Sequence, residues 1–190
     1  MNNYIFIKRL YDIAIASLVL LILSPLFLII AIFVKITSPG PLIYKQERVG
    51  LKGECFWLYK FRTMIKDAEK YTGPVWATKN DCRVTLLGKI LRRTRLDELP
   101  QIVNVLKGDM SIVGPRPERP FFVNKHKVLQ GIRLSVKPGL TGVAQIEGYY
   151  HTHPRNKLRY DYLYIKNQSL LLDAKLTLKT LLIIFTKPGS

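Results

Sequence analysis

A run of 22 residues without a charged side chain, Ile13 to Val34, constrains this chain more than any other feature. As a helix rising about 1.5 Å per residue, the run is long enough to cross the hydrocarbon core of a bilayer. It is apolar on all faces, whereas a helix packed on a soluble core keeps a polar face. It is too long for a cleaved signal peptide, and no small-residue cleavage site follows it. We therefore predict a membrane-embedded helix in residues 1–36; a buried helix of a soluble protein is the alternative.

A proline interrupts the middle of this run, at Ser24-Pro25. Proline removes one helical hydrogen bond and clashes with the preceding turn, so a kink is expected there. Lys8 and Arg9 precede the run and Lys35 follows it. Basic flanks favour the cytoplasmic side of a membrane, and a straight span cannot keep both flanks on that side. The sequence therefore predicts a re-entrant helix, kinked at Ser24 and Pro25, that enters and leaves by one face. A kinked spanning helix is the alternative.

The rest of the chain is strongly basic. The whole sequence has 30 Lys and Arg against 13 Asp and Glu, a formal net charge of +17. Such a balance indicates an anionic partner: phosphorylated substrates, an anionic membrane face or nucleic acid. Tyr59 to Arg62 alternates aromatic and basic side chains, as nucleic-acid binders do. A strand with a buried aromatic face has the same pattern, and we favour that interpretation. We expect membrane lipids as partners and no nucleic acid.

Cysteine and histidine give no metal-site pattern. Cys55 and Cys82 form no metal-ligand motif, so free thiols in a reducing compartment are the simpler interpretation. His151 and His153 alternate as ligands on a strand can, but no third His or nearby Cys joins them. We therefore predict no metal site at these histidines.

Two adjacent carboxylates, Asp97 and Glu98, stand among arginines in the stretch from Arg92 to Pro117. Apolar residues recur at helical spacing through this stretch, which predicts a helix with Asp97 as its N-cap and Gly108 at its end. A helix N-terminus favours negative charge and also binds phosphate. The acidic pair is therefore a candidate phosphate-handling site. Ordinary capping with charge balance is the alternative.

A rigid arginine follows in the segment Pro115-Arg116-Pro117. The two prolines fix the backbone on either side of the arginine, because the ring of proline locks its φ angle. A guanidinium held in this way suits a grip on phosphate. We therefore group Arg116 with the acidic pair.

The remaining pattern predicts an α+β fold that is predominantly helical, with residues 37–190 as a small domain outside the membrane. We expect short strands at 42–44 and 56–61 joined by a turn at 49–53, a strand at 143–146, and helices at 84–91, 121–134 and 156–167. The last segment, Leu170 to Phe185, mixes leucines with lysines, which fits an amphipathic helix on a membrane surface. A terminal helix packed on the core is the alternative.

Taken together, the motifs resemble those of the bacterial sugar transferases, the small monotopic phosphoglycosyl transferases. Any one motif alone is a weak signal, whereas the linked set covers nearly the whole chain and is specific. The set comprises Lys8-Arg9 with Asp12, Ser24-Pro25, Ser38-Pro39-Gly40-Pro41, Tyr44-Lys45-Gln46 with Arg48 and Gly50, Tyr59-Lys60-Phe61-Arg62-Thr63-Met64, Leu96-Asp97-Glu98-Leu99-Pro100-Gln101, Asn104-Val105-Leu106-Lys107-Gly108-Asp109-Met110-Ser111, Gly114-Pro115-Arg116-Pro117, Lys137-Pro138-Gly139 with Thr141-Gly142 and Ala144-Gln145, and Tyr160-Asp161 with Tyr164-Ile165.

The resemblance implies an enzyme that moves a sugar-1-phosphate from a UDP-sugar to undecaprenyl phosphate and releases UMP. This is the first membrane step of glycan or surface-polysaccharide assembly, at the cytoplasmic face of the bacterial inner membrane. The resemblance makes the apolar helix re-entrant and residues 37–190 the catalytic domain. It also implies that Asp97 is the nucleophile, which carries the phosphosugar covalently, that Glu98 is its partner, and that the two hold Mg²⁺.

The same resemblance suggests which groups meet the substrates. Lys60 and Arg92 match basic residues that contact the lipid phosphate. Pro115, Arg116 and Pro117 match a loop near the nucleotide diphosphate. The sequence lacks the multi-span N-terminal extension of larger relatives and resembles the minimal catalytic unit.

Two positions depart from the family pattern. Gly148-Tyr149-Tyr150 stands where many members have Gly-Arg-Asn, and Lys137 replaces the arginine of an Arg-Pro-Gly motif. The first departure leaves the sugar contacts open, so the sequence does not specify the sugar; the pathway and a homodimer are also left open. A membrane-anchored basic adaptor is the other functional class, and it predicts salt-sensitive binding without a metal requirement.

Overall fold

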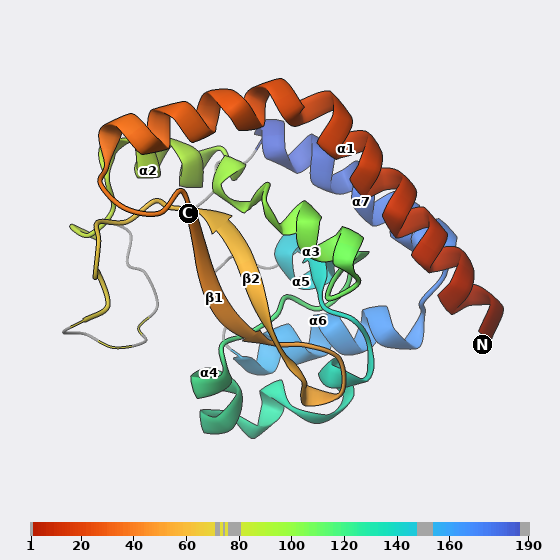
Figure 1. The fold of residues 1–190 in the computed structure, drawn as a ribbon. Helices are drawn as coiled ribbons and strands as arrows, with labels where there is room; N and C mark the ends of the chain where they lie inside the picture. Colours follow the sequence, from red (N-terminus) through yellow and green to blue (C-terminus); the bar gives the residue numbers. More distant parts are fainter. Residues whose placement is uncertain (1, 71–72, 74, 76–80, 148–153, 187–190) are drawn as a thin grey trace.

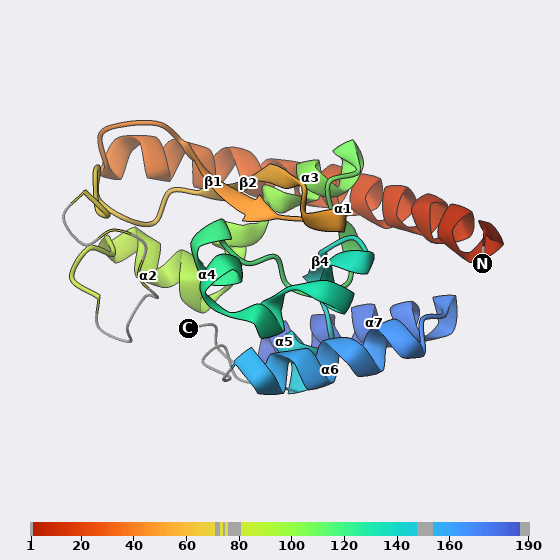
Figure 2. The ribbon, with the colours of Figure 1, turned by 90° about the horizontal axis from the view of Figure 1, so that it is seen from below.

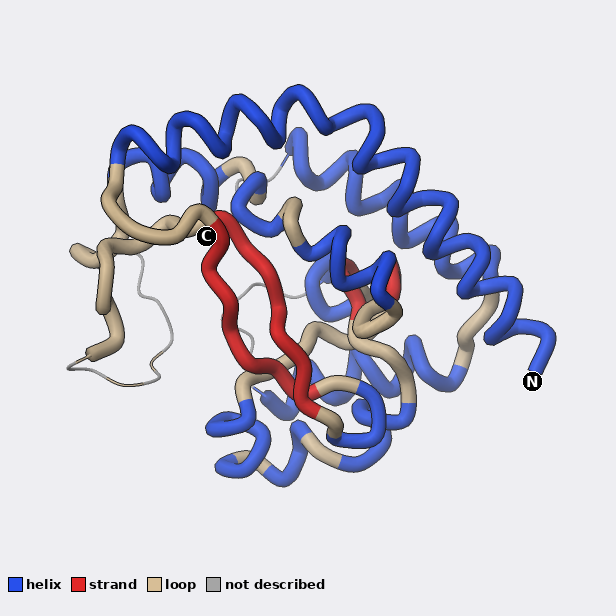
Figure 3. Tube along the Cα trace, in the orientation of Figure 1, coloured by secondary structure: helices blue, strands red, loops and turns tan. Residues whose placement is uncertain are grey.

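The computed structural model describes residues 2–70, 73, 75, 81–147 and 154–186 (Figure 1). Within these residues the chain is mostly helical with small sheets, which confirms the predominantly helical α+β class (Figure 3). The elements are α1 (Asn2–Thr37), β1 (Ile43–Val49), β2 (Cys55–Phe61), α2 (Leu86–Arg93), α3 (Gln101–Lys107), β3 (Ser111–Val113), α4 (Pro120–Lys125), β4 (Gly139–Thr141), α5 (Val143–Glu147), α6 (Pro154–Lys166) and α7 (Leu170–Thr186). Short 3-10 turns at Leu51–Gly53, Leu96–Glu98, Lys127–Leu129 and Gly131–Ser135 complete the list.

Helix α1 runs along one side of the whole molecule and bends partway along its length (Figure 1). Pro25 lies inside the helix and cannot donate to the carbonyl of Leu21, four residues earlier. The hydroxyl of Ser24 donates to that carbonyl instead, at 2.9 Å. Leu21 and Leu28 are 74% and 64% exposed, and α1 is long and apolar enough to cross a membrane. These features fit membrane association, while the re-entrant path stays a prediction.

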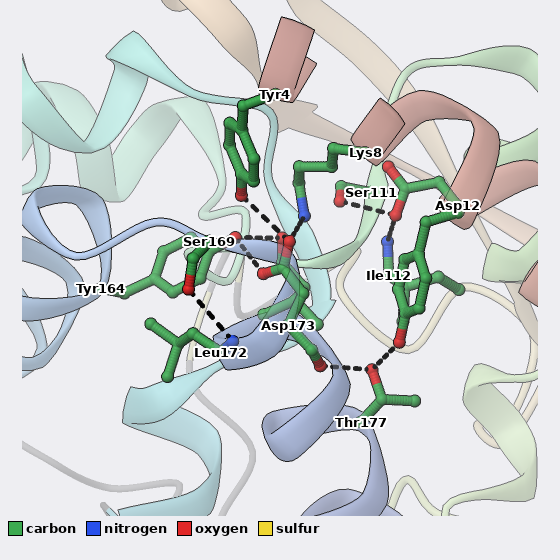
Figure 4. Close-up of polar contacts among 12 residues, drawn as sticks. Tyr4, Lys8, Asp12, Ser111, Ile112, Tyr164, Ser169, Leu172, Asp173 and Thr177 are labelled. Atoms are coloured by element: carbon green, nitrogen blue, oxygen red, sulfur yellow. Dashed lines mark hydrogen bonds and ion pairs between the residues drawn. The ribbon is translucent and has the colours of Figure 1, made fainter. Parts of the chain in front are cut away.

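Polar contacts join the N-terminal half of α1 to the elements beneath it. The guanidinium of Arg9 donates to the carbonyls of Val105 and Leu106 at 2.6 and 2.7 Å, at the C-terminal end of α3. A cation is favourable there because the last carbonyls of a helix have no partner within the helix. The buried carboxylate of Asp12 accepts from the backbone N–H of Ile112 and the hydroxyl of Ser111, at 2.9 and 3.0 Å (Figure 4). Helix α1 therefore binds both α3 and β3.

A second polar cluster joins α1 to the C-terminal helices (Figure 4). Asp173 of α7 is fully buried and accepts from the Tyr4 hydroxyl at 3.0 Å, the Lys8 ammonium at 2.8 Å and the Tyr164 hydroxyl of α6 at 2.8 Å. A buried carboxylate needs such partners to offset its lost hydration. The Asp173 carboxylate thus joins helices α1, α6 and α7 through one buried cluster of polar contacts.

The C-terminal end of α1 is held by a different element. The guanidinium of Arg62, just after β2, donates to the carbonyls of Ser38 and Pro41, both at 2.5 Å. Apolar packing of Ile30 and Val34 against Phe61 surrounds this contact. Both ends of α1 are therefore attached to the same folded body.

Strands β1 and β2 form an antiparallel hairpin that pairs Ile43 with Phe61 and Val49 with Cys55. The hairpin was predicted, but its first strand is longer than residues 42–44, because the polar residues 45–48 keep pairing with β2. The buried amide of Asn104 bridges β2 to α3: it donates to the Trp57 carbonyl at 2.7 Å and accepts from the Tyr59 N–H at 3.1 Å. In Figure 2, α6 and α7 lie along the edge opposite the hairpin.

Two element predictions are wrong. Residues 143–146 belong to α5, and the strand lies earlier, at β4, where Gly139 and Thr141 pair in parallel with β3. A Cβ at Gly139 would lie 2.0 Å from the Gly114 nitrogen, so the approach of the two strands requires glycine. The helix predicted at 121–134 is broken, because α4 ends at Lys125 and two 3-10 turns follow.

The remaining helices confirm their predictions within a few residues at each end. Helix α7 combines the two alternatives considered for the C-terminal segment. Its Leu176 and Ile183 are buried in the core, whereas Leu171, Leu178 and Leu182 are more than 60% exposed. One face of α7 therefore packs on the domain and the other presents leucines to the surroundings.

Asp173→Asn removes the counter-charge of Lys8 inside the cluster of Figure 4. We expect the free energy of unfolding to fall by about 3 kcal/mol, since an ammonium is left buried without its partner. Thermal unfolding in detergent micelles measures the change. Lys179→Met on the same helix is the control, because its pair with Glu147 is about half exposed and worth less than about 1 kcal/mol. Equal losses in both variants would contradict this role of Asp173.

Candidate active site

The acidic pair lies on a tight turn rather than on the first turn of a helix. Residues Leu96–Glu98 form a 3-10 turn between α2 and α3, and Arg95 before it has a left-handed φ of 60°. The prediction that Asp97 is the N-cap of a helix is wrong, because α3 begins only at Gln101 and Pro100 occupies its cap position. Pro100 has no N–H, so it offers no donor to a capping carboxylate three residues earlier. The turn buries Asp97, which is 7% exposed.

Glu98 forms ion pairs with two basic side chains that are not its neighbours in the sequence. The Lys60 ammonium of β2 donates to Glu98 Oε1 at 2.8 Å. The Arg116 guanidinium donates to both carboxylate oxygens, with Nη2 2.5 Å from Oε1 and Nη1 3.2 Å from Oε2. A bidentate guanidinium pair fixes direction as well as charge. The structure therefore brings together Lys60, Glu98 and Arg116, three of the residues that the motifs singled out.

The two carboxylates differ in their titration. Burial raises the pKa of Asp97 to about 6; the nearby Lys60 opposes this shift and the charge of Glu98 adds to it. For Glu98, burial also acts to raise the pKa, but the attraction of Arg116 and Lys60 outweighs it and the pKa is lowered. Glu98 is therefore a fixed anion, whereas Asp97 changes its charge closer to neutral pH.

The Asp97 carboxylate accepts no hydrogen bond from any of the residues that the structure describes. Arg92 of α2 acts on it through charge and favours its ionised form. The Nε of Arg92 donates to the Thr63 hydroxyl at 3.0 Å, so Arg92 lies beside the pair without binding either carboxylate directly. Asp97 therefore keeps free acceptor capacity in a basic surrounding.

The backbone of Pro115, Arg116 and Pro117 follows β3 and is held by two arginines that the sequence analysis did not assign to the site. Arg48 of β1 and Arg133 each donate to a carbonyl of this segment. Arg48 was noted only as part of a motif, and Arg133 lay inside a predicted helix with nothing to mark it. Both positions become visible only once the chain has folded.

The donor set at the acidic pair fits a magnesium ion that substrate phosphates complete. Mg²⁺ usually takes one or two protein carboxylates together with phosphate oxygens and water. Among the described residues, no hydrogen bond to the Asp97 carboxylate is found, and Glu98 Oε2 accepts one, from Arg116. No cluster of three or more His, Cys, Asp or Glu residues occurs in the described part of the chain. His151 and His153, and also Gly148-Tyr149-Tyr150, lie outside the described residues.

The chain belongs to the bacterial sugar transferase family, whose model matches residues 3–187. Three relatives show the range of similarity. An Aeromonas hydrophila protein named UDP-N-acetylgalactosamine-undecaprenyl-phosphate N-acetylgalactosaminephosphotransferase is 43% identical over 193 residues, 98% of this chain and 45% of the relative. A Klebsiella pneumoniae UDP-glucose:undecaprenyl-phosphate glucose-1-phosphate transferase is 45% identical over 186 residues, 94% and 40% of the two chains. The exopolysaccharide production protein ExoY of Sinorhizobium fredii is 36% identical over 197 residues, 96% and 87% of the two chains.

The relatives differ in length and in the sugar that their names give. The chain spans less than half the length of the Aeromonas and Klebsiella proteins, but most of the length of ExoY. The Aeromonas name specifies N-acetylgalactosamine, and the Klebsiella name specifies glucose. The family match therefore covers nearly the whole chain, whereas the sugar differs among its relatives.

The pH dependence of the stability lost in Glu98→Gln tests how much the ion pairs of Glu98 stabilise the fold. Because the folded-state pKa of Glu98 is lowered from 4.5, its ionised form stabilises the fold above that pH, and the contribution is lost as the pH falls towards the lowered value. We expect Glu98→Gln to lose about 2 kcal/mol at pH 7 and clearly less at pH 3.5. Thermal unfolding at the two pH values measures this, and a loss that does not shrink at pH 3.5 would contradict the lowered pKa.

Proposed function

We propose that this chain transfers a sugar-1-phosphate from a UDP-sugar to undecaprenyl phosphate and releases UMP. The observation that carries the proposal is the buried Asp97, which is free to accept and stands beside the Lys60–Glu98–Arg116 ion pairs. The names of the relatives support this class of reaction. The adaptor alternative has no comparable support, because binding without chemistry does not require an acidic pair in a basic site.

In the first proposed step, an oxygen of the ionised Asp97 attacks the phosphorus that carries the sugar. A P–O bond forms to Asp97, and the bond to UMP breaks as UMP leaves with the electron pair. In the second step, a phosphate oxygen of undecaprenyl phosphate attacks the same phosphorus and Asp97 leaves as a carboxylate. A covalent intermediate of this kind divides one difficult displacement into two easier ones.

The cations of the site have to offset the negative charge of both substrates. Arg116, held between Pro115 and Pro117, is proposed to contact the nucleotide diphosphate, and Lys60 and Arg92 to contact the lipid phosphate. Asp97 and Glu98 would hold Mg²⁺, which when bound neutralises charge on phosphate oxygens. Glu98 keeps Arg116 and Lys60 in place through the ion pairs described above.

The proposed location is the cytoplasmic face of the bacterial inner membrane, with residues 1–36 embedded as a re-entrant helix and residues 37–190 as the catalytic domain. Arg9 binds α3 near one end of α1, and Arg62 binds the other end of α1. The attachment of both ends of the helix to one domain supports a path that keeps those ends on one side of the bilayer. The exposed leucines of α7 add a proposed membrane-surface contact. A homodimer stays a prediction.

Asp97→Asn should abolish covalent labelling of the protein by a UDP-sugar whose β-phosphate is radioactive, and should lower the rate of UMP release by at least about 10³-fold. Asp67→Asn is the control, because Asp67 is exposed and Asn tolerates its left-handed φ of 57°. Labelled Asp97→Asn protein would place the nucleophile elsewhere. UMP release without any label on the wild type would replace the two steps with a single displacement.

Magnesium binding should depend on the charge of Asp97. Because the pKa of Asp97 is about 6, its carboxylate is mostly protonated at pH 5.5 and mostly ionised at pH 7.5. We expect Mg²⁺ to bind the protein about fourfold more tightly at pH 7.5 than at pH 5.5, since the ligand must be ionised. Calorimetric titration measures this, with Asp97→Asn as a control whose affinity does not change over that range. Equal wild-type affinities at both pH values would contradict the assignment, as would UMP release that continues with a chelator present.

A further inference from the structure

All three carbonyls of the segment Pro115–Pro117 accept a hydrogen bond from elsewhere in the chain. The Pro115 carbonyl accepts from the Gly139 N–H at 2.9 Å. The Arg116 carbonyl accepts from Arg133 Nη2 at 3.1 Å, and the Pro117 carbonyl from Arg48 Nη1 at 2.9 Å. The two prolines have no N–H, so their carbonyls are the only backbone groups by which they can be tied down. Hydrogen bonds to its backbone carbonyls therefore hold the segment in place.

Arg133 differs from the other two donors because it is itself held by a buried ion pair. Its side chain is 4% exposed, and its Nε donates to Asp161 Oδ2 of α6 at 2.6 Å. One edge of the guanidinium therefore binds a carboxylate while Nη2 reaches the carbonyl of Arg116. A second ion pair joins α6 to the adjacent Glu118, through Lys157 at 2.8 Å. Through these two ion pairs, helix α6 fixes Arg133 and Glu118 beside the segment Pro115–Pro117.

The direction of the Arg116 side chain depends on its backbone. Its guanidinium binds the Glu98 carboxylate, while its backbone carbonyl accepts a hydrogen bond from Arg133. We propose that Arg133 is a positioning residue for the transfer reaction, which holds the backbone of Arg116 so that the Arg116 guanidinium stays at the acidic pair. The proposal rests on the proposed function, in which Arg116 contacts the nucleotide diphosphate. Arg133 acts through Arg116 and does not itself meet the substrate.

Arg133→Lys is the sharpest variant, because a lysine retains a positive charge for Asp161 but lacks the planar fork that serves two acceptors at once. We expect kcat/KM for UMP release to fall about tenfold in the wild-type background and by less than about twofold in the Arg116→Ala background, because one residue acts through the other. Arg119→Lys is the matched control. It alters the neighbouring bidentate pair with Glu69 and should change kcat/KM by less than about twofold.

Two results would overturn the positioning role: no loss in the wild-type background, or an equal loss in both backgrounds, as expected for general destabilisation. Thermal unfolding of the same proteins gives a readout that needs no substrate. If Arg133 holds Arg116 at Glu98, the Tm loss caused by Glu98→Gln is smaller in the Arg133→Lys background, whereas additive losses overturn the role. If the wild type releases no UMP from any UDP-sugar, the proposed function fails, and the unfolding data still decide the positioning claim.

Discussion

The attachment of one apolar helix to the domain that carries the acidic pair is the constraint on which the rest of the structure depends. Arg9 binds the last carbonyls of α3, and this helix begins at Gln101, three positions after Glu98. Asp12 binds the start of β3, which leads into Pro115-Arg116-Pro117. Because ionic and backbone hydrogen bonds are directional, these contacts fix the position of the acidic pair relative to the helix.

The two neighbouring carboxylates of the acidic pair differ in their partners. Glu98 is saturated by Lys60 and Arg116 and acts as a counter-ion. Asp97 is more deeply buried, 7% exposed, and also lies in a basic surrounding, but its carboxylate has no hydrogen-bond donor among the described residues. Two adjacent residues of one chemical type are separated into two roles by their partners. Because a 3-10 helix has three residues per turn, successive side chains of the turn at Leu96–Glu98 lie on different faces and can meet different partners.

Features that depend on residues close together in the sequence could be predicted, whereas features that depend on residues far apart in the sequence could not. The apolar run, the hairpin and most helices follow from local patterns, and the motif set singled out Lys60, Glu98 and Arg116, which the fold brings together. The N-cap assigned to Asp97 was wrong because Pro100 has no N–H and the N–H of Leu99 donates to the Leu96 carbonyl. The strand predicted at 143–146 was wrong because the strand in this region is β4, which pairs with β3. Contacts such as Asp12 with Ile112, 100 residues apart, have no local signature.

The central claim is that both ends of α1 lie on the same side of the membrane as the acidic site. Cysteine accessibility in intact bacterial spheroplasts measures it most directly, with a membrane-impermeant thiol reagent. One protein retains only Cys55 of the hairpin, which is exposed, and another has Asn3→Cys as its sole cysteine. The account predicts that both thiols are protected in intact spheroplasts and react after permeabilisation. Reaction at position 3 in intact spheroplasts, with Cys55 protected, would contradict it.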